Sequence, residues 1–566
     1  MNILIPSIIV AISVGYISFG GLKYVDAYNL YTKYSYYIVL IGTIIWLCKL
    51  VNILPKRRVC FYIIKRHLYP VVLAFFIVMA MFRVSPPDFR ILADETNLLS
   101  VSQSMYEDHT VFNVTQKFNY NHNFYERKSK TLEKRPLLYP LCVSVLHSFL
   151  GYSYKNAFVL NGICMFVSLI VIYFIAVPYW GRFWGTVTML TLAAFPILVL
   201  YTTSAGFDIF NMVWALILIV VLRSFIKYRS ASLAEFVLYT SLMLAQTRYE
   251  SAMAIILVIP FIFYFLPKAK YCNLSLACVV YPFFILPITV INKLTYNSKS
   301  LQVDSLEEAF GVGHFFRNIR LSLPFFLGDR YDYGMSRIAA YLTIFACLIL
   351  IVKLFKGKHV RILHENKALI LFVFVFYLLH AFVKFSYYWG NLTLQHASRH
   401  GIVFIPIIAF MSAYSIKWLV ETLSLKRFLA MLVPVFIAFY GWPAAAQNLA
   451  VREISLFREF KSIREYLEIH YPNKKEYLLV TPVANLYVPF NYSVVSPTYF
   501  NVNYELIKDK INNGYWHNII LVQKLNKETE EIYSESQIKK IVKLQKLCDI
   551  NQINDNIIRI STLTLN

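Results

Sequence analysis

Two adjacent acids, Asp94 and Glu95, lie in a polar segment that follows a long apolar stretch of the chain. The segment reads SPPDFRILADETNLLSVSQSMYED, and it begins shortly after Met81 and Phe82, where an apolar helix should leave a membrane. A carboxylate in this position can take a proton from the hydroxyl or amine of an acceptor. The alternative is structural, because an acid near the start of the helix NLLSVSQSMYED caps the helix and meets its dipole.

A basic cluster closes the same polar segment. The sequence LEKRPLLYPL places Glu133, Lys134 and Arg135 directly before apolar residues. Arginine matches phosphate oxygens with a two-pronged fork, so these cations suit the phosphate group of a lipid. Lys134 and Arg135 would also serve as anchors of an interfacial helix, with their charged ends reaching toward water. Acids and cations at a water–lipid boundary together suit a reaction between a phosphate-bearing lipid and a polar acceptor.

Further charged residues stand at the ends of later apolar stretches. Asp208 opens one such stretch after YTTSAGF, where it either caps the helix or assists Asp94 as a second acid. Arg248 and Glu250, in AQTRYES, either pair with each other or contribute to phosphate binding and to an accessory role.

Three more candidates lie toward the middle of the chain. Arg399 and His400 begin the stretch GIVFIP, on a side where the positive-inside rule disfavours a purely structural cation, so Arg399 is a candidate for the lipid phosphate and His400 for an accessory role. His314, in GVGHFFRN, is interpreted as a loop histidine, with an accessory role or a divalent metal as the alternative. The cysteine spacing indicates neither a metal site nor a disulfide framework, so no metal ligands are assigned.

The composition requires a membrane protein. Hydrophobic residues make up 58% of the 566 residues and charged residues only 15%, against about 25% in soluble proteins. The net charge of +24 falls mostly in short loops between apolar stretches. Membrane topology explains such a distribution, and we expect no nucleic-acid partner.

We expect thirteen membrane spans. Their approximate ranges are 3–20, 35–53, 69–83, 157–177, 184–204, 208–224, 232–247, 251–267, 273–291, 338–354, 368–385, 400–420 and 428–446. Basic residues concentrate in the loops 56–66, 223–229 and 353–367, which this count places on one side, the cytoplasmic side. The N-terminus is then cytoplasmic, and the Asp94 loop (84–156), the loop 292–337 and the C-terminal segment are outside. This assignment of sides holds only if 137–150 forms an interfacial helix that does not cross the membrane.

The segment 447–566 has the pattern of a separate extracytoplasmic α/β domain. Leu456, Phe460, Ile463 and Leu467 are spaced for one face of a helix. Strands are expected at 477–481, 518–523 and 557–561, with a helix ended by Gly514 and another at 535–547. Residues 1–446 then form the transmembrane domain of a polytopic α-helical membrane protein.

Taken together, these motifs resemble the GT-C superfamily of membrane glycosyltransferases. Over roughly 69–420 the chain looks most like the group that includes the protein O-mannosyltransferases and the lipid A aminoarabinose transferase. The likeness rests on ADET after a span, RPLLYPL at the loop's end, Asp208 before a span, RYES, and SRHGIVFIP. The resemblance implies that Asp94 is the main catalytic acid/base residue with support from Glu95, that Asp208 is the second acid, and that Arg135 faces the donor phosphate.

The sequence therefore predicts an integral-membrane glycosyltransferase of the plasma or inner membrane. It would move a sugar from a polyprenyl-phosphate donor to an envelope lipid, glycan or protein acceptor on the outer face. Lys134, Arg135, Arg248 and Arg399 would bind the donor phosphate. The alternatives are a lipid-linked oligosaccharide polymerase or ligase, and a flippase or transporter of lipid-linked sugars, whose charged residues would lie near the middle of the membrane.

Overall fold

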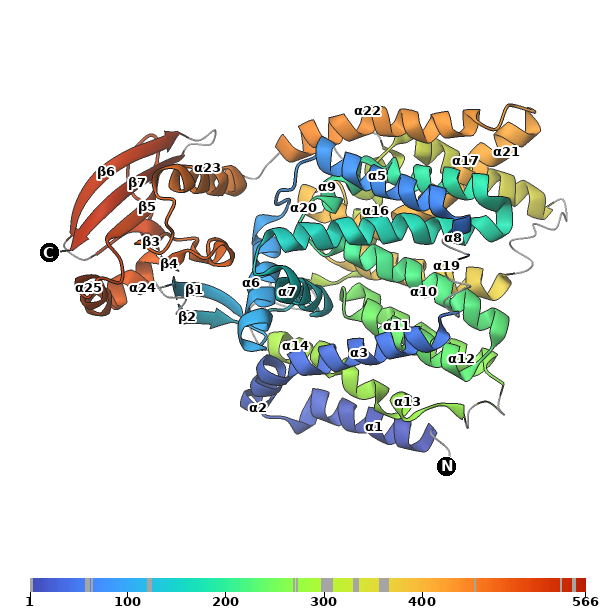
Figure 1. Cartoon of the computed structure of the whole chain (residues 1–566), viewed down its shortest axis with the longest axis horizontal. Coiled ribbons are helices and arrows are strands. Elements are labelled where there is room, and N and C mark those ends of the chain that lie inside the picture. The colour runs from blue at the N-terminus through green and yellow to red at the C-terminus, as the bar shows by residue number, and fades with distance from the viewer. Residues whose placement is uncertain are drawn as a thin grey trace. The chain divides into compact units, whose positions relative to one another are not determined.

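The computed structural model covers one chain and separates into two compact units (Figure 1). Unit 1 comprises residues 1–90, 134–142 and 157–451, and unit 2 comprises 91–133, 143–156 and 452–566. The structure describes residues 4–565 apart from 56–61, 63–64, 120–124, 268–269, 271–272, 297–308, 329–334, 356–365, 452–454, 540–541 and 552–555. Parts of the basic loops 56–66 and 353–367, and of the loop 292–337, therefore lie outside the described residues.

Unit 1 is helical, and Figure 1 shows α5, α8, α10 and α22 running in similar directions. Its α-helices are α1 (Leu4–Tyr16), α2 (Tyr24–Asn29), α3 (Ser35–Ile53), α5 (Leu68–Val84), α8 (Lys155–Ala193), α9 (Pro196–Thr202), α10 (Asp208–Tyr228), α11 (Ala231–Ala245), α12 (Met253–Phe265), α13 (Leu276–Val280), α14 (Leu286–Tyr296), α16 (Val312–Leu327), α17 (Arg337–Phe355), α19 (Lys367–Ser386), α20 (Gln395–Ser398), α21 (Ile405–Thr422) and α22 (Leu429–Val451). The 3₁₀ segments η4 (Glu250–Ala252), η6 (Tyr281–Ile285) and η8 (Arg399–Phe404) and the π segments η1 (Ile17–Gly21) and η2 (Leu30–Tyr34) join them.

Seven helices among the described residues are long and apolar enough to cross a membrane. Shorter apolar helices cover Pro6–Tyr16, Leu68–Val84, Leu138–Leu150, Ala231–Ala245 and Glu250–Phe265. The chain is thus an integral membrane protein, whereas the expected count of thirteen spans is not confirmed.

The region 157–204, where two spans are expected, forms the 39-residue α8 followed by α9. A straight helix of that length would measure roughly 60 Å, about twice the hydrocarbon thickness. Gly181 interrupts it with φ 83° and ψ 176°, a backbone conformation that other residues rarely adopt. The break therefore divides α8 into two helical pieces.

Unit 2 contains a seven-stranded sheet in the order β2-β1-β4-β3-β5-β7-β6. The strands are β1 (Asn113–Asn119), β2 (Tyr125–Thr131), β3 (Tyr477–Val480), β4 (Ser493–Val495), β5 (Asn518–Asn526), β6 (Val542–Asn551) and β7 (Asn556–Leu565). β3 runs parallel to β4 and β5, and all other pairs are antiparallel. The helices are α6 (Leu92–Asp108), α7 (Leu138–Leu150, shared with unit 1), α23 (Ser455–His470), α24 (Pro497–Val502) and α25 (Tyr504–Asn512), with the 3₁₀ turns η9 (Ala484–Leu486), η10 (Val488–Phe490) and η11 (Ser534–Ser536).

The three strands and the first two helices expected in the C-terminal segment are confirmed. Phe460, Ile463 and Leu467 are buried on one face of α23, while the side chain of Leu456 lies outside the described residues. Gly514 has φ 75° just after α25. The helix expected at 535–547 is wrong, since the described part of that range begins at the end of the 3₁₀ turn η11 and ends in strand β6. The hairpin β1–β2 and strand β4 were not expected.

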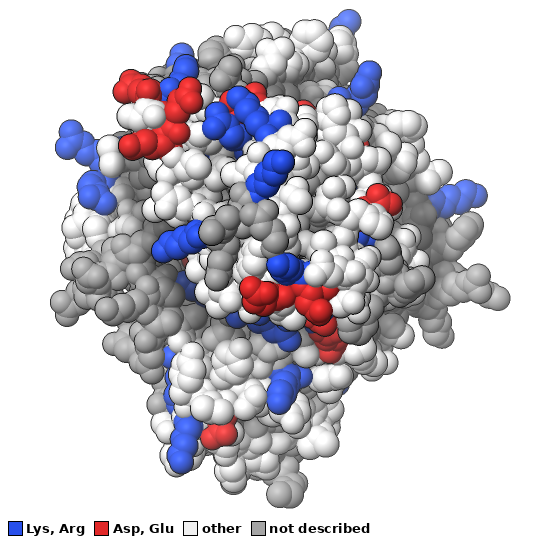
Figure 2. All heavy atoms as spheres, turned by 90° about the vertical axis from the view of Figure 1, so that its left-hand side faces the viewer, with Lys and Arg blue, Asp and Glu red and all other residues white. Residues whose placement is uncertain are grey.

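Charges are mixed on the face of the molecule shown in Figure 2, where basic and acidic side chains lie interspersed among uncharged ones. Proteins that bind nucleic acid usually present a basic stripe or patch. The high net charge of the chain is therefore not gathered into one such patch on this face.

Candidate functional site

Asp208 is the first residue of α10, and the loop before it is fixed by a neighbouring helix. Asn161 Nδ2 on α8 donates hydrogen bonds of 2.7 Å to the carbonyl oxygens of both Ser204 and Gly206. The Asp208 side chain is buried, and among the described residues its Oδ2 atom has no hydrogen-bond partner. One carboxylate oxygen thus remains available for a further interaction.

Arg248 is the centre of a charged cluster in unit 1. Its Nη1 donates to Asp208 Oδ1, and its Nη2 donates to His400 Nδ1. Its Nε lies 3.6 Å from Glu250 Oε2, and the guanidinium stacks 4.9 Å above the ring of Phe207. The pairing of Arg248 with Glu250 considered from the sequence is present, and it extends to Asp208 and His400. His400 Nδ1 also lies 3.6 Å from Glu250 Oε1.

The turn that carries Arg248 is attached to α10. The hydroxyl groups of Thr247 and Ser251 each donate to Asn211 Oδ1 at 2.6 Å. Asn211 lies three residues after Asp208 on the same helix. These bonds hold Arg248 and Glu250 beside the first turn of α10, which is why the ion pair with Asp208 forms.

Two further cations lie in this cluster. Arg399 is buried at the start of η8, with its guanidinium 6.0 Å from the centre of the Phe207 ring. Lys384, near the end of α19, is also buried and interacts electrostatically with Glu250, Arg248, Arg399 and Asp208. The cluster therefore holds three basic side chains, Arg248, Lys384 and Arg399, beside the two carboxylates of Asp208 and Glu250.

Lys384 and His380 were missed by the sequence reasoning. They lie one turn apart on α19, and both are buried. His380 packs against Phe404, with ring centres 5.9 Å apart. The signal was present, because ionisable residues inside an apolar span are rare and usually face functional interiors.

The basic segment at 134–135 is attached to the same turn of unit 1. The hydroxyl of Tyr249 donates to the carbonyl oxygen of Lys134, and Leu138 N donates to Gln246 O at 3.2 Å. Both bonds join residues that flank Arg135 to residues that flank Arg248. The backbone on either side of Arg135, which is partly exposed, is thereby joined to the turn that carries Arg248.

Asp94 and Glu95 belong to unit 2, at the start of α6. Glu95 is buried, and its Oε1 accepts a hydrogen bond of 3.3 Å from Ile91 N. This bond ties the Glu95 side chain back to Ile91, the residue before the first turn of α6. Asp94 is partly exposed in the first turn. In chain order it follows Arg90, which is bonded within unit 1 to Ser85 Oγ at 2.8 Å and Thr203 Oγ1 at 3.2 Å.

The other end of α6 carries an ion-pair group. Glu107 lies 3.5 Å from Lys117 Nζ and 2.8 Å from Arg127 Nη2. Burial lowers the pKa of Lys117, and the Glu107 carboxylate partly opposes this change. The group fastens α6 to the hairpin β1–β2, so the first turn with Asp94 projects from a fixed helix.

His314 lies within α16 and not in a loop, which corrects the interpretation from the sequence. Arg317 Nη2 donates to its Nδ1 at 3.3 Å. Across the described residues, no group of three or more His, Cys, Asp or Glu side chains is arranged to hold a metal ion. No donor set for a divalent metal is therefore assigned.

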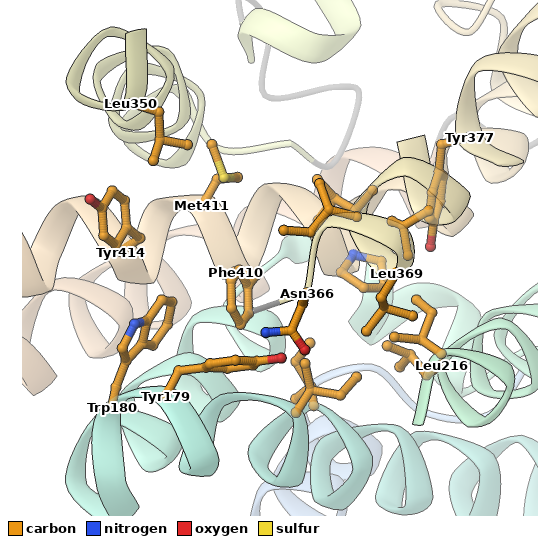
Figure 3. Close-up of a pocket in the computed structure, with 17 residues that line it drawn as sticks. Tyr179, Trp180, Leu216, Leu350, Asn366, Leu369, Tyr377, Phe410, Met411 and Tyr414 are labelled. Atoms are coloured by element: carbon orange, nitrogen blue, oxygen red, sulfur yellow. The ribbon is translucent and has the colours of Figure 1, made fainter. Parts of the chain in front are cut away.

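An apolar cavity of about 260 Å³ lies between α8, α10, α17, α19 and α21. Figure 3 shows Leu216, Leu369 and Phe410 around it, with the aromatic rings of Tyr179 and Trp180 on one side. Residues of the charged cluster lie at the ends of three of these elements. Asp208 begins α10, Lys384 lies near the end of α19, and Arg399 begins the η8 segment that leads into α21. Charged groups and an apolar cavity are thus distributed along the same helices.

Comparisons with known proteins give fold likenesses only. No known family and no curated protein matches the chain. ArnT from Cupriavidus metallidurans in the apo state is 9% identical, with a TM-score of 0.49 over 88% of this chain and 98% of that chain. ArnT bound to undecaprenyl phosphate is 10% identical, with a TM-score of 0.47 and the same coverage. The oligosaccharyltransferase AglB from Archaeoglobus fulgidus, in complex with an inhibitory peptide and a dolichol-phosphate, is 10% identical, with a TM-score of 0.44 over 88% of this chain and 76% of that chain.

These likenesses concern the fold of the chain alone.

Proposed function

We propose that the chain is an integral-membrane glycosyltransferase that moves a sugar from a polyprenyl-phosphate donor to an envelope lipid, glycan or protein acceptor on the outer face. The observation that carries the proposal is the buried cluster around Arg248. It combines three basic side chains and two carboxylates at the ends of apolar helices. Because the basic groups outnumber the carboxylates, the cluster suits an anionic ligand.

A lipid phosphate fits this excess. Arg248 is engaged by Asp208, His400 and Glu250, so it supports the cluster more than it offers a free fork. Arg399, Lys384 and Arg135 are then the cations that would face the phosphate oxygens. Helix α10 also begins at Asp208, and the N-terminus of a helix carries the positive end of its dipole.

The proposed reaction needs no general acid, because the phosphate is already a good leaving group. The acceptor oxygen or nitrogen forms a bond to the anomeric carbon of the sugar, and the bond from that carbon to the phosphate oxygen breaks. Asp94 would receive the acceptor's proton, with Asp208 as an assisting acid. The cations would stabilise the negative charge that develops on the departing polyprenyl phosphate. The apolar cavity lies on the helices that carry this cluster, which suits a substrate with an apolar chain.

The alternatives make different demands. A flippase or transporter would place its charges near the middle of the membrane, whereas Asp208, Glu250 and Arg399 lie at helix ends. A polymerase or ligase would take its sugar from a polyprenyl-pyrophosphate-linked oligosaccharide.

The two enzyme classes can be separated with the purified chain in lipid vesicles. Radiolabelled polyprenyl-phosphate sugar and polyprenyl-pyrophosphate oligosaccharide would each be supplied with an envelope extract as acceptor. We expect label to move only from the monophosphate donor. Transfer from the pyrophosphate donor alone would support the polymerase or ligase, and movement of either lipid across the bilayer without transfer would support a flippase.

A further inference from the structure

Helix α16 (Val312–Leu327) carries an unusual apolar stripe on its surface. Its members are between 38% and 66% exposed, and they are Val312, Phe316, Ile319, Leu323 and Leu327. Their spacing follows the helical repeat, so at about 100° per residue they lie on one face. A soluble surface rarely shows such a continuous apolar row, which marks a contact with something apolar.

The face of α16 next to this stripe is fixed to the rest of unit 1. Asn318 Nδ2 donates to the carbonyl oxygens of Phe385 at 3.0 Å and Tyr387 at 2.7 Å. Ser322 Oγ accepts from Leu392 N at 2.9 Å, and Phe325 is fully buried. The stripe is therefore held outward by a bonded inner face.

Both ends of α16 are attached at the same end of a helical hairpin. Gly311 N, just before α16, donates to Ser386 O at the last residue of α19, at 3.0 Å. Arg337 Nε, at the first residue of α17, donates to Gly328 O at 3.3 Å. Because α17 and α19 are consecutive apolar helices, the start of α17 and the end of α19 lie at one end of the pair. Helix α16 thus lies at the level where these helices end.

The stripe adjoins a lipid-facing surface. On α19, apolar residues that are at least 50% exposed recur at Leu371, Phe374, Leu378 and Phe382. The last of these contacts α16 directly, since the rings of Phe382 and Phe315 have centres 5.6 Å apart. An exposed apolar row on a membrane-crossing helix faces acyl chains, and the α16 stripe begins where that row ends.

Two exposed arginines complete the pattern. Arg320 and Arg317 lie on α16 about 60° and 120° from the centre of the stripe, on the side away from the bonded inner face. Helices that lie in a membrane interface combine an apolar face with flanking Lys or Arg that reach lipid headgroups. Charge complementarity then selects anionic headgroups.

We infer that α16 is a membrane-docking helix whose stripe enters the lipid leaflet while Arg317 and Arg320 bind anionic phospholipid headgroups. The occupant of this surface is the lipid bilayer around the chain. This inference is independent of the enzymatic reaction, because it rests on the surfaces of α16 and α19 and on how α16 is attached.

The test uses nitroxide labels on the full-length chain in lipid nanodiscs, in a background whose eight cysteines are replaced. Labels are placed at Phe316 and Leu323 on the stripe and, as a matched control, at Leu321. Leu321 is also exposed but lies about 160° from the stripe centre. We expect the stripe labels to be relaxed by oxygen, which dissolves in lipid, and the Leu321 label by a water-soluble nickel complex.

The charge requirement is tested with the double variant R317Q/R320Q. A basic residue near an anionic membrane favours binding by roughly fivefold, so the docked fraction of the Phe316 label should rise when phosphatidylglycerol replaces phosphatidylcholine. The double variant should lose this dependence. Relaxation of the Phe316 label by nickel would overturn the inference, and so would shielding from both reagents, which indicates cover by another protein or a second copy. A lipid response that the double variant retains would overturn the role of the arginines.

Discussion

Arg248 organises the charged cluster because a guanidinium has several donors in fixed directions. Asp208, His400 and Glu250 each occupy a different nitrogen of it, and Phe207 covers its face. Removing one partner from such a buried group leaves an uncompensated charge, which typically costs about 3–5 kcal/mol. The Arg248 cluster is therefore a rigid support for the neighbouring residues that would act on a substrate.

Asp94 and Glu95 are neighbours with different expected roles, which makes them a matched pair. Asp94→Asn keeps the shape of the side chain but removes the base, so transfer should fall by ~10²–10⁴-fold with normal insertion. Glu95→Gln retains an oxygen that can accept from Ile91 N, and should leave transfer and stability nearly unchanged. Turnover of both purified variants checks this, and near-normal turnover of Asp94→Asn would exclude Asp94 as the base.

Arg135 distinguishes phosphate binding from anchoring. Arg135→Lys keeps the charge but loses the planar fork, and losing a charge-assisted hydrogen bond of about 1.5–3 kcal/mol should lower kcat/KM for the donor roughly ten- to hundredfold. A Lys anchors an interfacial helix as well as an Arg does, so a silent Arg135→Lys would indicate an anchor. Steady-state kinetics with the donor as varied substrate, with Arg135→Ala as the stronger variant, decides between the two.

At the level of single elements, α16 packs directly on the segment that carries Arg399 and His400. Its buried Phe325 packs on Gly401, the residue that follows His400. A Cβ atom added at Gly401 would lie 2.5 Å from the Phe325 ring, closer than any ordinary contact. The glycine is therefore required by packing, since its φ angle lies in the ordinary helical range of η8. Sequence reasoning could not find this contact, because it joins elements more than seventy residues apart.

Gly401→Ala should consequently disturb both stability and transfer. Overpacking of a buried site costs about 1–3 kcal/mol, and a shift of Arg399 and His400 should lower kcat/KM by roughly ten- to hundredfold. Gly313→Ala on α16 is the control, because nothing lies within 4 Å of its added Cβ. Thermal unfolding in detergent and donor kinetics measure the two effects. The added variant Phe325→Leu should restore part of each, and an unchanged double variant would show that the clash is not the cause.

The whole molecule shows where sequence reasoning succeeds and where it fails. Apolar spans and the cluster of Asp208, Arg248, Glu250, Arg399 and His400 were accessible, because long apolar runs and charges at their ends are local signals. Local signals did not show which segments of the chain make up unit 2. Its sheet joins β1 and β2, from the loop after α6, to strands nearly four hundred residues later. A division of the chain at residue 447 therefore separates strands that pair, and no local pattern reports such pairing.

Ser493 is the residue at which these distant segments meet. Its Oγ accepts from Asn119 N at 2.8 Å and donates to Asn119 O at 2.7 Å, while Trp516 Nε1 donates to it at 3.2 Å. Ser493, Asn119 and Trp516 are all buried. Ser493→Ala leaves these groups without their partner, at a cost of about 1–3 kcal/mol.

If unit 2 unfolds as one cooperative body, the loss of stability in Ser493→Ala affects all its segments equally. Amide hydrogen exchange in Ser493→Ala should then accelerate in β1 and in β5 by the same factor, roughly five- to hundredfold. Thr529→Ala, at an exposed turn of the same unit, is the control and should change neither strand. If the loop strands and the C-terminal strands instead form separate domains, only one set should lose protection, because the other would keep its own stability. Equal acceleration would show that Asp94 stands on a helix whose fold depends on the last hundred residues of the chain.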